Sequence, residues 1–207
     1  MTAVLDRPER QVIVNATWET FERLLADAGE CRGTRFTFDQ GVLEITMPSQ
    51  KHETLIKTIE MVIDALIDEL ELDFFGTRST TFKRPDLEKG FEADSSYYFE
   101  NADQVDGKEK IDLTKDPPPD LIIEVDVTND SLNKLPIYAA VGTPEVWRYV
   151  NSALTILELR DSAYVPSPTS RAFPKVTNAA LTEIVALRNE LSGKLWLRRV
   201  HSWARSL

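Results

Sequence analysis

Two carboxylates stand at the end of an apolar segment that follows a cluster of prolines. The segment Leu121 to Val125 is short and rich in β-branched residues, which predicts a buried strand of a sheet. Side chains alternate across a strand, so Glu124 and Asp126 share one face while Ile123 and Val125 share the other. A carboxylate that leaves water is costly unless a cation or hydrogen-bond donors meet it. The pattern therefore predicts a metal site.

Two further charged residues extend this group. Asp94 stands at the start of another predicted strand, and Lys134 lies just beyond the turn that follows Asp126. Oxygen ligands from Asp94, Glu124 and Asp126 suit a hard ion such as Mg²⁺ or Mn²⁺. Such an ion activates water and offsets charge on a phosphate, while Lys134 can neutralise the same oxyanion or orient the attacking water. The constellation predicts hydrolysis of a phosphodiester.

The elements that must position these residues follow an α/β pattern. Thr17 is predicted to cap a helix that ends at Gly29, and Ser49 to cap a long helix with an apolar stripe up to Leu70. A short helix is predicted near Leu135 to Val141. Strands are predicted at residues 35–38, 42–46, 79–83, 95–99, 121–125, 146–150 and 154–159, with a polar turn at 85–90. This order predicts a central mixed β-sheet flanked by helices.

Size and charge limit the class of protein. A chain of 207 residues predicts one domain over residues 1–207, with a core at about 11–160 and a helical C-terminal tail at about 178–205. No apolar stretch approaches the ~20 residues of a membrane span, and Met1 to Asp6 lacks the features of a signal peptide. We therefore expect a cytoplasmic protein with no membrane partner. The lone Cys31 excludes an intrachain disulfide, and the net charge of -10 argues against a protein that coats nucleic acid electrostatically.

Several ordered motifs carry a resemblance to a known family. Over roughly Gln11 to Leu159, the chain resembles the Uma2 family of restriction-type endonucleases, which is abundant in cyanobacteria, in the segments Gly41 to Glu44, Ser49 to Glu53, Gly90 to Asp94, Pro118 to Val125 and Tyr138 to Trp147. That family looks like a branch of the PD-(D/E)xK nuclease superfamily, in which an Asp and a Glu-x-Lys motif surround a divalent ion. The resemblance implies a restriction-endonuclease-like core, with Asp94 as the motif aspartate and Glu124 as the motif glutamate.

The chain departs from this motif at one position. The lysine expected two residues after Glu124 is replaced by Asp126. In relatives the lysine can migrate to the neighbouring helix, which makes Lys134 the matching candidate, at the entrance of a helix whose first turn holds Pro136. Lys83, on a preceding strand, is the second candidate.

Two residues at the start of the long helix are further candidates. His52 borders the inner face of this helix and reads equally as a catalytic or as a satisfied buried histidine. Glu53 is a catalytic candidate, but in the first helical turn it also fits a carboxylate that favours the helix dipole.

The sequence thus predicts a metal-dependent endodeoxyribonuclease with DNA as its substrate. Its predicted catalytic residues are Asp94, Glu124, Lys134, His52 and Glu53, and a homodimer is predicted because enzymes that cut a duplex often pair two sites. Two rival classes stay open, namely an inactive interaction module with the nuclease fold and a metal-dependent hydrolase of smaller phosphate esters.

Overall fold

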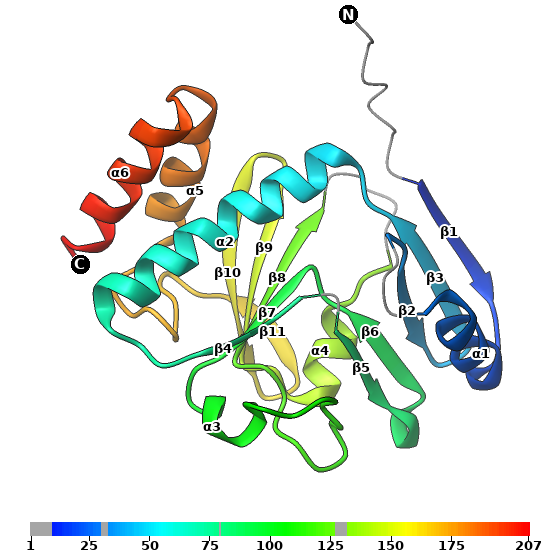
Figure 1. Cartoon of the computed structure of the whole chain (residues 1–207). Coiled ribbons are helices and arrows are strands. Elements are labelled where there is room, and N and C mark those ends of the chain that lie inside the picture. The colour runs from blue at the N-terminus through cyan, green and yellow to red at the C-terminus, as the bar shows by residue number, and fades with distance from the viewer. Residues whose placement is uncertain (1–9, 30–32, 79, 127–131) are drawn as a thin grey trace, which may run out of the picture.

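The computed structural model describes residues 10–29, 33–78, 80–126 and 132–207, so Met1 to Asp6, Cys31 and Ser79 lie outside the described residues. Strands within this part form two sheets (Figure 1). The first sheet is antiparallel throughout, in the order β1 (Arg10–Asn15), β3 (Val42–Met47), β2 (Arg35–Asp39), β6 (Lys89–Glu92) and β5 (Thr81–Arg84). One face of it is covered by helix α1 (Trp18–Ala28), through a cluster of Phe21, Phe36, Phe38 and Leu43.

The second sheet is the mixed central sheet that the sequence predicts. Its order is β11 (Ala163–Pro166), β10 (Ala153–Arg160), β9 (Glu145–Val150), β8 (Leu121–Asp126), β7 (Ser95–Tyr98) and β4 (Phe75–Thr77). Strands β8 and β9 run parallel, and the other neighbours are antiparallel. The chain passes from β6 of the first sheet to β7 of the second through Ala93 and Asp94.

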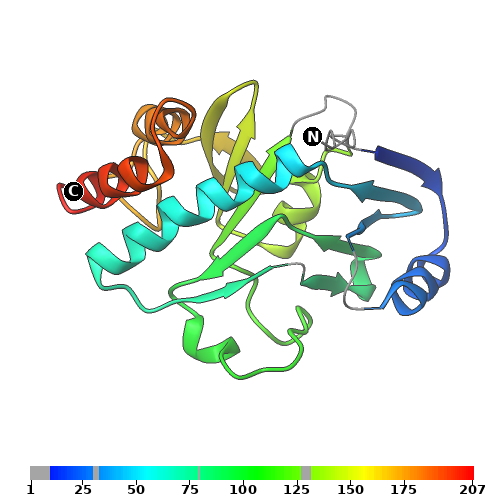
Figure 2. The ribbon, with the colours of Figure 1, turned by 45° about the horizontal axis from the view of Figure 1, so that its top comes forward.

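Helices cover both faces of the central sheet (Figures 1 and 2). One face packs against α2 (Gln50–Leu70), α5 (Asn178–Ala186) and α6 (Gly193–Ala204), with Ile63, Ile123 and Trp147 in the shared core. The other face packs against α4 (Leu135–Val141) and the short helix α3 (Ala102–Val105). Two 3₁₀ turns, at Pro85–Leu87 and Leu187–Asn189, complete the described elements. No described helix combines the length and hydrophobicity that a membrane-spanning segment requires.

The local signals for the helix ends are confirmed. The Thr17 hydroxyl accepts a hydrogen bond from the Thr20 backbone N–H at 3.3 Å, and the Ser49 hydroxyl accepts one from the His52 backbone N–H at 3.2 Å. Each bond satisfies a backbone donor that the first turn of a helix leaves without a partner. The second cap fixes where α2 begins and therefore sets His52 in the first turn of the helix.

The predicted polar turn at residues 85–90 is wrong in its second half. Lys89–Glu92 form strand β6, which pairs with β2 and β5. A Cβ atom at Gly90 would lie 2.5 Å from ring atoms of Phe21, so a glycine is needed where α1 presses on this strand. The single-domain organisation stays a prediction.

Candidate functional site

The carboxyl end of β8 presents two acidic side chains on the face predicted from the strand period. Ile123 and Val125 pack in the core shared with α2, while Ile122 packs with α4 on the opposite face. Glu124 and Asp126 follow the same alternation as Ile122 and line a cleft beside α4. Both side chains are partly buried, so each needs a partner.

Glu124 is held by two donors from the start of α4. The Lys134 ammonium lies 2.9 Å from Glu124 Oε2, and the Tyr138 hydroxyl donates a hydrogen bond to Glu124 Oε1. Helix α4 begins at Leu135, with Pro136 in its first turn, so Lys134 stands at the helix entrance. The pKa of Tyr138 is raised well above its ordinary value, mainly by burial and to a smaller extent by the negative charge of Glu124. The Tyr138 hydroxyl therefore stays protonated and keeps donating to Glu124.

Asp94 lies between the two sheets and is almost completely buried, with 1% of its surface exposed. Its Oδ2 atom accepts a hydrogen bond of 2.8 Å from the Val125 backbone N–H and lies 3.2 Å from His52 Nε2. Its Oδ1 atom forms an ion pair with Arg35 of β2. Asp94 is thus bound to both sheets and to α2, which fixes its carboxylate beside the end of β8.

His52 connects α2 to β8. Its Nε2 atom lies 2.9 Å from the Val125 carbonyl oxygen. A carbonyl only accepts, so this contact requires a hydrogen on Nε2, which the neighbouring Asp94 carboxylate can share. The Nδ1 atom of His52 is buried and has no hydrogen-bond partner among the described residues. In this arrangement His52 positions Asp94 and the backbone of Val125.

Asp126 lies at the mouth of the cleft. Its Oδ2 atom pairs at 2.7 Å with Arg148 of the parallel neighbour β9. Asp126 also lines a second, larger groove of about 590 Å³ that runs along the first turns of α2, with Lys51, Tyr149 and Arg188 in its walls. The cleft and the groove therefore meet at Asp126.

The cleft itself is small and rich in carboxylates. Its volume is about 40 Å³, close to the ~30 Å³ that one water molecule occupies in the liquid. It is lined by four carboxylates, those of Glu44, Asp94, Glu124 and Asp126. Carboxylate oxygens are the ligands that a hard divalent cation such as Mg²⁺ or Mn²⁺ prefers, and the lining also holds His52, Arg35, Lys134 and Arg148. No three of the four carboxylates have ligand atoms within 4.8 Å of one another, so a bound cation would have to draw them together. The space admits a group of ionic size and excludes a nucleotide.

The structure brings together most, though not all, of the residues that the sequence singles out. Asp94, Glu124, Asp126, His52 and Lys134 all line the cleft. Their roles in catalysis and metal binding stay predictions.

Two other candidates lie outside the cleft lining. Glu53 is 43% exposed in its side chain and pairs with Arg35 at 2.7 Å and with Arg78 at 2.8 Å. Its Oε1 atom also lies 3.9 Å from His52 Nδ1, so Glu53 borders the cleft through Arg35 and His52. Lys83 points to α1, where it pairs with Glu22 at 2.8 Å. Of the two candidate lysines, Lys134 is the one beside Glu124.

Several residues of the cleft are absent from the sequence-based set of candidates, among them Tyr138, Arg35 and Glu44. Tyr138 sits in an apolar helix and reads as a core residue, although its hydroxyl contacts Glu124. Arg35 and Glu44 come from neighbouring strands of the first sheet, and only tertiary packing brings them to β8. The position of Glu44 in one of the motif segments is the one signal that marked it.

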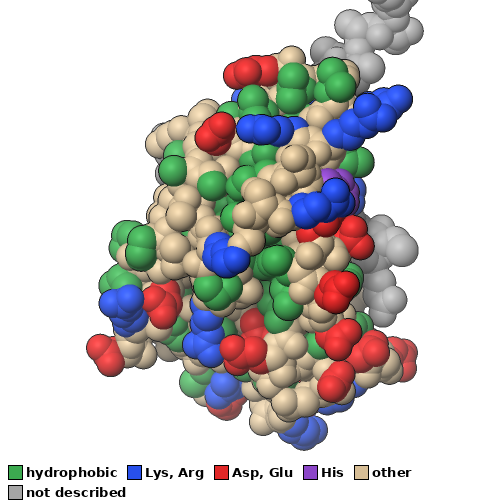
Figure 3. Space-filling view, turned by 90° about the vertical axis from the view of Figure 1, so that its left-hand side faces the viewer, with side chains coloured by type: hydrophobic (Ala, Val, Ile, Leu, Met, Phe, Trp, Pro, Cys, Tyr) green, Lys and Arg blue, Asp and Glu red, His purple; other side chains and the backbone are tan. Residues whose placement is uncertain are grey.

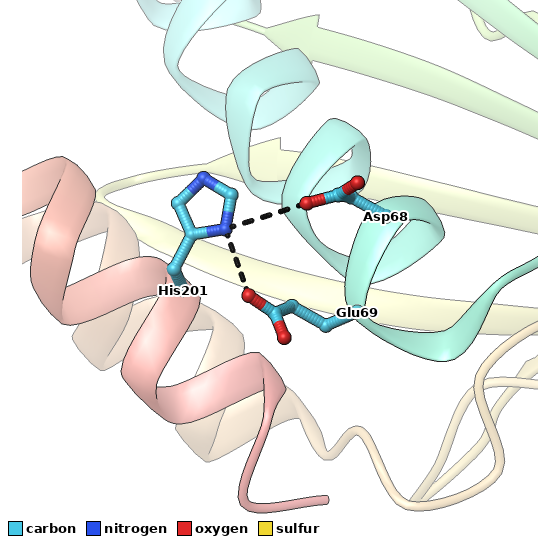
Figure 4. Close-up of side chains that lie close together, drawn as sticks. All are labelled: Asp68, Glu69 and His201. Atoms are coloured by element: carbon cyan, nitrogen blue, oxygen red, sulfur yellow. Dashed lines mark hydrogen bonds and ion pairs between the residues drawn. The ribbon is translucent and has the colours of Figure 1, made fainter.

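A separate cluster of donors lies where α2 meets α6 (Figure 4). Asp68, Glu69 and His201 are the one trio of His, Cys, Asp or Glu residues among the described residues whose ligand atoms lie within 4.8 Å of one another. Arg205 already donates hydrogen bonds of 2.8 and 2.7 Å to the two oxygens of Glu69. The hydrogen bonds from Arg205 are the main cause that lowers the pKa of Glu69, and the contact with His201 is a smaller one. The cluster is thus an ion-pair network between two helices, and its carboxylate already has a cation.

Charge on the surface is mixed. On the face in Figure 3, Lys and Arg side chains lie among Asp and Glu side chains and form no continuous basic area. Lys194, Arg198 and Arg205 line a shallow depression on α6, which packs against α2. Since the chain carries a net charge of -10, contact with a polyanion requires local basic groups such as those beside the cleft.

Comparison with known proteins agrees with this fold. The crystal structure of a protein from Anabaena variabilis ATCC 29413, described as "a putative nuclease belonging to DUF820", superposes with a TM-score of 0.56 and 12% sequence identity, over 82% of this chain and 99% of that one. A search of curated proteins finds no match. The family model described as "Uma2: Putative restriction endonuclease" matches residues 18–190, more than half of the chain. The chain therefore belongs to the Uma2 family of putative restriction endonucleases.

Proposed function

We propose that the protein is a Mg²⁺- or Mn²⁺-dependent endonuclease that hydrolyses phosphodiester bonds in DNA, with a site of the PD-(D/E)xK type. Membership of a family described as restriction endonucleases supports a nucleic acid as the substrate. The observation that carries the proposal is the convergence of Asp94, Glu124 and Lys134 on one narrow cleft.

In this proposal Asp94 and Glu124 hold the cation and Asp126 contributes at the mouth of the cleft. A bound divalent cation supplies Lewis-acid activation of water and neutralises charge on the phosphate. The protein fixes both carboxylates beforehand. Asp94 is held by the Val125 backbone N–H, and Glu124 is held by Lys134 and Tyr138. Such fixed positions avoid reorganisation when the substrate arrives.

Lys134 provides a positive charge at the reacting centre, beside Arg35 and Arg148, which pair with Asp94 and Asp126. The Lys134 side chain is 15% exposed in a cleft too small for a nucleotide, so the ammonium would meet the phosphate at the mouth. There it can donate a hydrogen bond to a phosphate oxygen or orient the attacking water. The Glu124 carboxylate keeps the lysine side chain pointed into the cleft.

The adjoining groove gives the DNA strand a path to this point. Its wall carries the cations of Lys51 and Arg188, the ring of Tyr149 and many neutral polar groups, with Asp126 as the acidic exception. Cations neutralise phosphates, and an aromatic ring can stack on a base. A strand in this groove passes Asp126 and so presents a phosphate to the mouth of the cleft.

The test is cleavage of supercoiled plasmid by wild-type protein and by Glu124→Ala. Wild type should nick or linearise the plasmid in Mg²⁺ or Mn²⁺ and stop on addition of EDTA, while Glu124→Ala should lose cleavage and weaken calorimetric Mn²⁺ binding. The matched control is Glu158→Ala, which removes a strand carboxylate that pairs with Arg160 away from the cleft.

Each other outcome has a defined meaning. Cleavage that persists in EDTA, or a Glu124→Ala variant as active as wild type, would refute the mechanism. Wild-type protein that binds Mn²⁺ and hydrolyses a small phosphate ester but leaves DNA intact would support the rival hydrolase. Protein that binds no metal and cuts no nucleic acid would support the interaction module. The predicted homodimer and cytoplasmic location stay predictions.

A further inference from the structure

Glu44 is a buried carboxylate of the first sheet, and one of its oxygens has no hydrogen-bond partner among the described residues. It lies in the middle of β3, with 1% of its surface exposed, and it lines the cleft together with Asp94 and Glu124. Tyr138, whose hydroxyl contacts Glu124, lines the same cleft. Glu44 therefore faces the same centre from the opposite sheet.

The two oxygens of Glu44 differ in their partners. The Oε1 atom accepts a hydrogen bond of 2.8 Å from the Leu132 backbone N–H and another from the Gln11 amide. The Oε2 atom is buried and has no hydrogen-bond partner among the described residues. A buried carboxylate oxygen without a donor is destabilising, and folded proteins rarely keep one without a reason.

Glu44 also differs from the other three carboxylates of the cleft. Asp94 pairs with Arg35, Glu124 with Lys134 and Asp126 with Arg148. In the described part of the chain no Lys, Arg or His side chain forms an ion pair with Glu44. The positive charge that would balance Glu44 is thus not supplied by those residues.

We propose that Oε2 of Glu44 is a further ligand of the divalent cation in the cleft. The proposal rests on the proposed function, since it concerns the same metal site. Glu44 has a buried oxygen without a hydrogen-bond partner among the described residues, and it lines the cleft beside three other carboxylates, whose oxygens are the ligands that Mg²⁺ and Mn²⁺ prefer. The two hydrogen bonds to Oε1 hold the carboxylate in place, in the manner of partners that orient metal ligands. The cation then joins β3 of the first sheet to β8 of the second.

The decisive variant is Glu44→Gln, studied in the full-length protein with Mn²⁺ as the probe. Glutamine keeps the size of the side chain and an oxygen acceptor for Leu132 and Gln11, and it removes the charge. We expect calorimetric Mn²⁺ affinity to fall at least about tenfold, as for the loss of groups that support a metal site. The rise in melting temperature on addition of Mn²⁺ should shrink with it. Without metal, the melting temperature should stay the same or rise, because an unpaired buried charge is gone.

Glu92→Gln is the matched control. Glu92 is also a buried carboxylate of the first sheet, but its oxygens accept hydrogen bonds from the Thr81 hydroxyl and the Phe36 backbone N–H, and it does not line the cleft. Its substitution should leave Mn²⁺ affinity unchanged. A purely structural Glu44 would give the same result for Glu44→Gln, with unchanged Mn²⁺ affinity, and this would overturn the proposal.

Two comparisons separate this proposal from the proposed function. If Glu124→Ala weakens Mn²⁺ binding and Glu44→Gln does not, only the role of Glu44 is refuted. If neither variant alters Mn²⁺ binding, the cleft is not the metal site and both proposals fail. A Glu44→Gln protein that is unfolded without metal would also contradict the proposal, because it would show that the charge is needed for stability.

Discussion

Replacing Lys134 with methionine should separate catalysis from metal binding. Methionine keeps most of the length of the side chain and removes an ammonium that lies 2.9 Å from Glu124 Oε2, with both side chains largely buried. Two unit charges about 4 Å apart interact by about 4 kcal/mol at an effective dielectric constant of about 20. If Lys134 meets the charge that develops on the phosphate, its loss should lower kcat by ~10²- to 10³-fold. Mn²⁺ affinity should stay the same or increase, because Lys134 is a cation that competes for Glu124.

The assay compares single-turnover cleavage of a labelled duplex with calorimetric Mn²⁺ titration. Lys83→Met is the matched control, since Lys83 is the alternative lysine and forms a largely exposed pair with Glu22. This control should retain both activities and lose at most about 1 kcal/mol of stability. Normal cleavage by Lys134→Met would refute the assigned role, and a loss of cleavage confined to Lys83→Met would transfer that role to Lys83.

Two further predictions concern the scaffold. Ile63 of α2 is completely buried against the central sheet, so Ile63→Ala should cost about 2–5 kcal/mol in chemical denaturation; a loss below about 1 kcal/mol would show that this face is not packed as described. Burial raises the pKa of four tyrosines above its ordinary value of 10.0, namely those of Tyr97, Tyr98, Tyr138 and Tyr164. Because the unfolded chain then ionises first, stability should be retained below about pH 10 and fall above it, by up to ~1.4 kcal/mol per pH unit for each tyrosine. Free tyrosine titrates at about pH 10, so urea midpoints should be compared between about pH 9 and about pH 11. Midpoints that stay constant over this range would contradict the predicted loss of stability.

Elements whose signals are local could be predicted from the sequence. Thr17 and Ser49 were identified as caps because a cap needs one side chain and the backbone N–H three residues later. The start of α4 at Leu135 likewise follows from Pro136 alone. Strand β6 was missed because Gly90 breaks a strand pattern, and the reason for that glycine is a phenylalanine ring from a distant helix.

The candidate site divides in the same way. The common face of Glu124 and Asp126 follows from the period of one strand, and the structure confirms that face. The choice between Lys83 and Lys134 depends on which element packs near β8, which no local pattern specifies. The place of Glu44 was beyond reach for the same reason, because it depends on how β3 of one sheet docks beside β8 of the other.

The chain passes from the first sheet to the second at Asp94, so the cleft is assembled only when both sheets have formed and packed together. Its side chains come from segments far apart in sequence, so the site needs many long-range contacts, which form late relative to local helices and hairpins. A partial opening that separates the two sheets would dismantle the cleft while each sheet keeps its own hydrogen bonds. Nascent chains and partly unfolded molecules would thus lack the assembled cleft, and the proposed reaction would be confined to molecules that have completed folding.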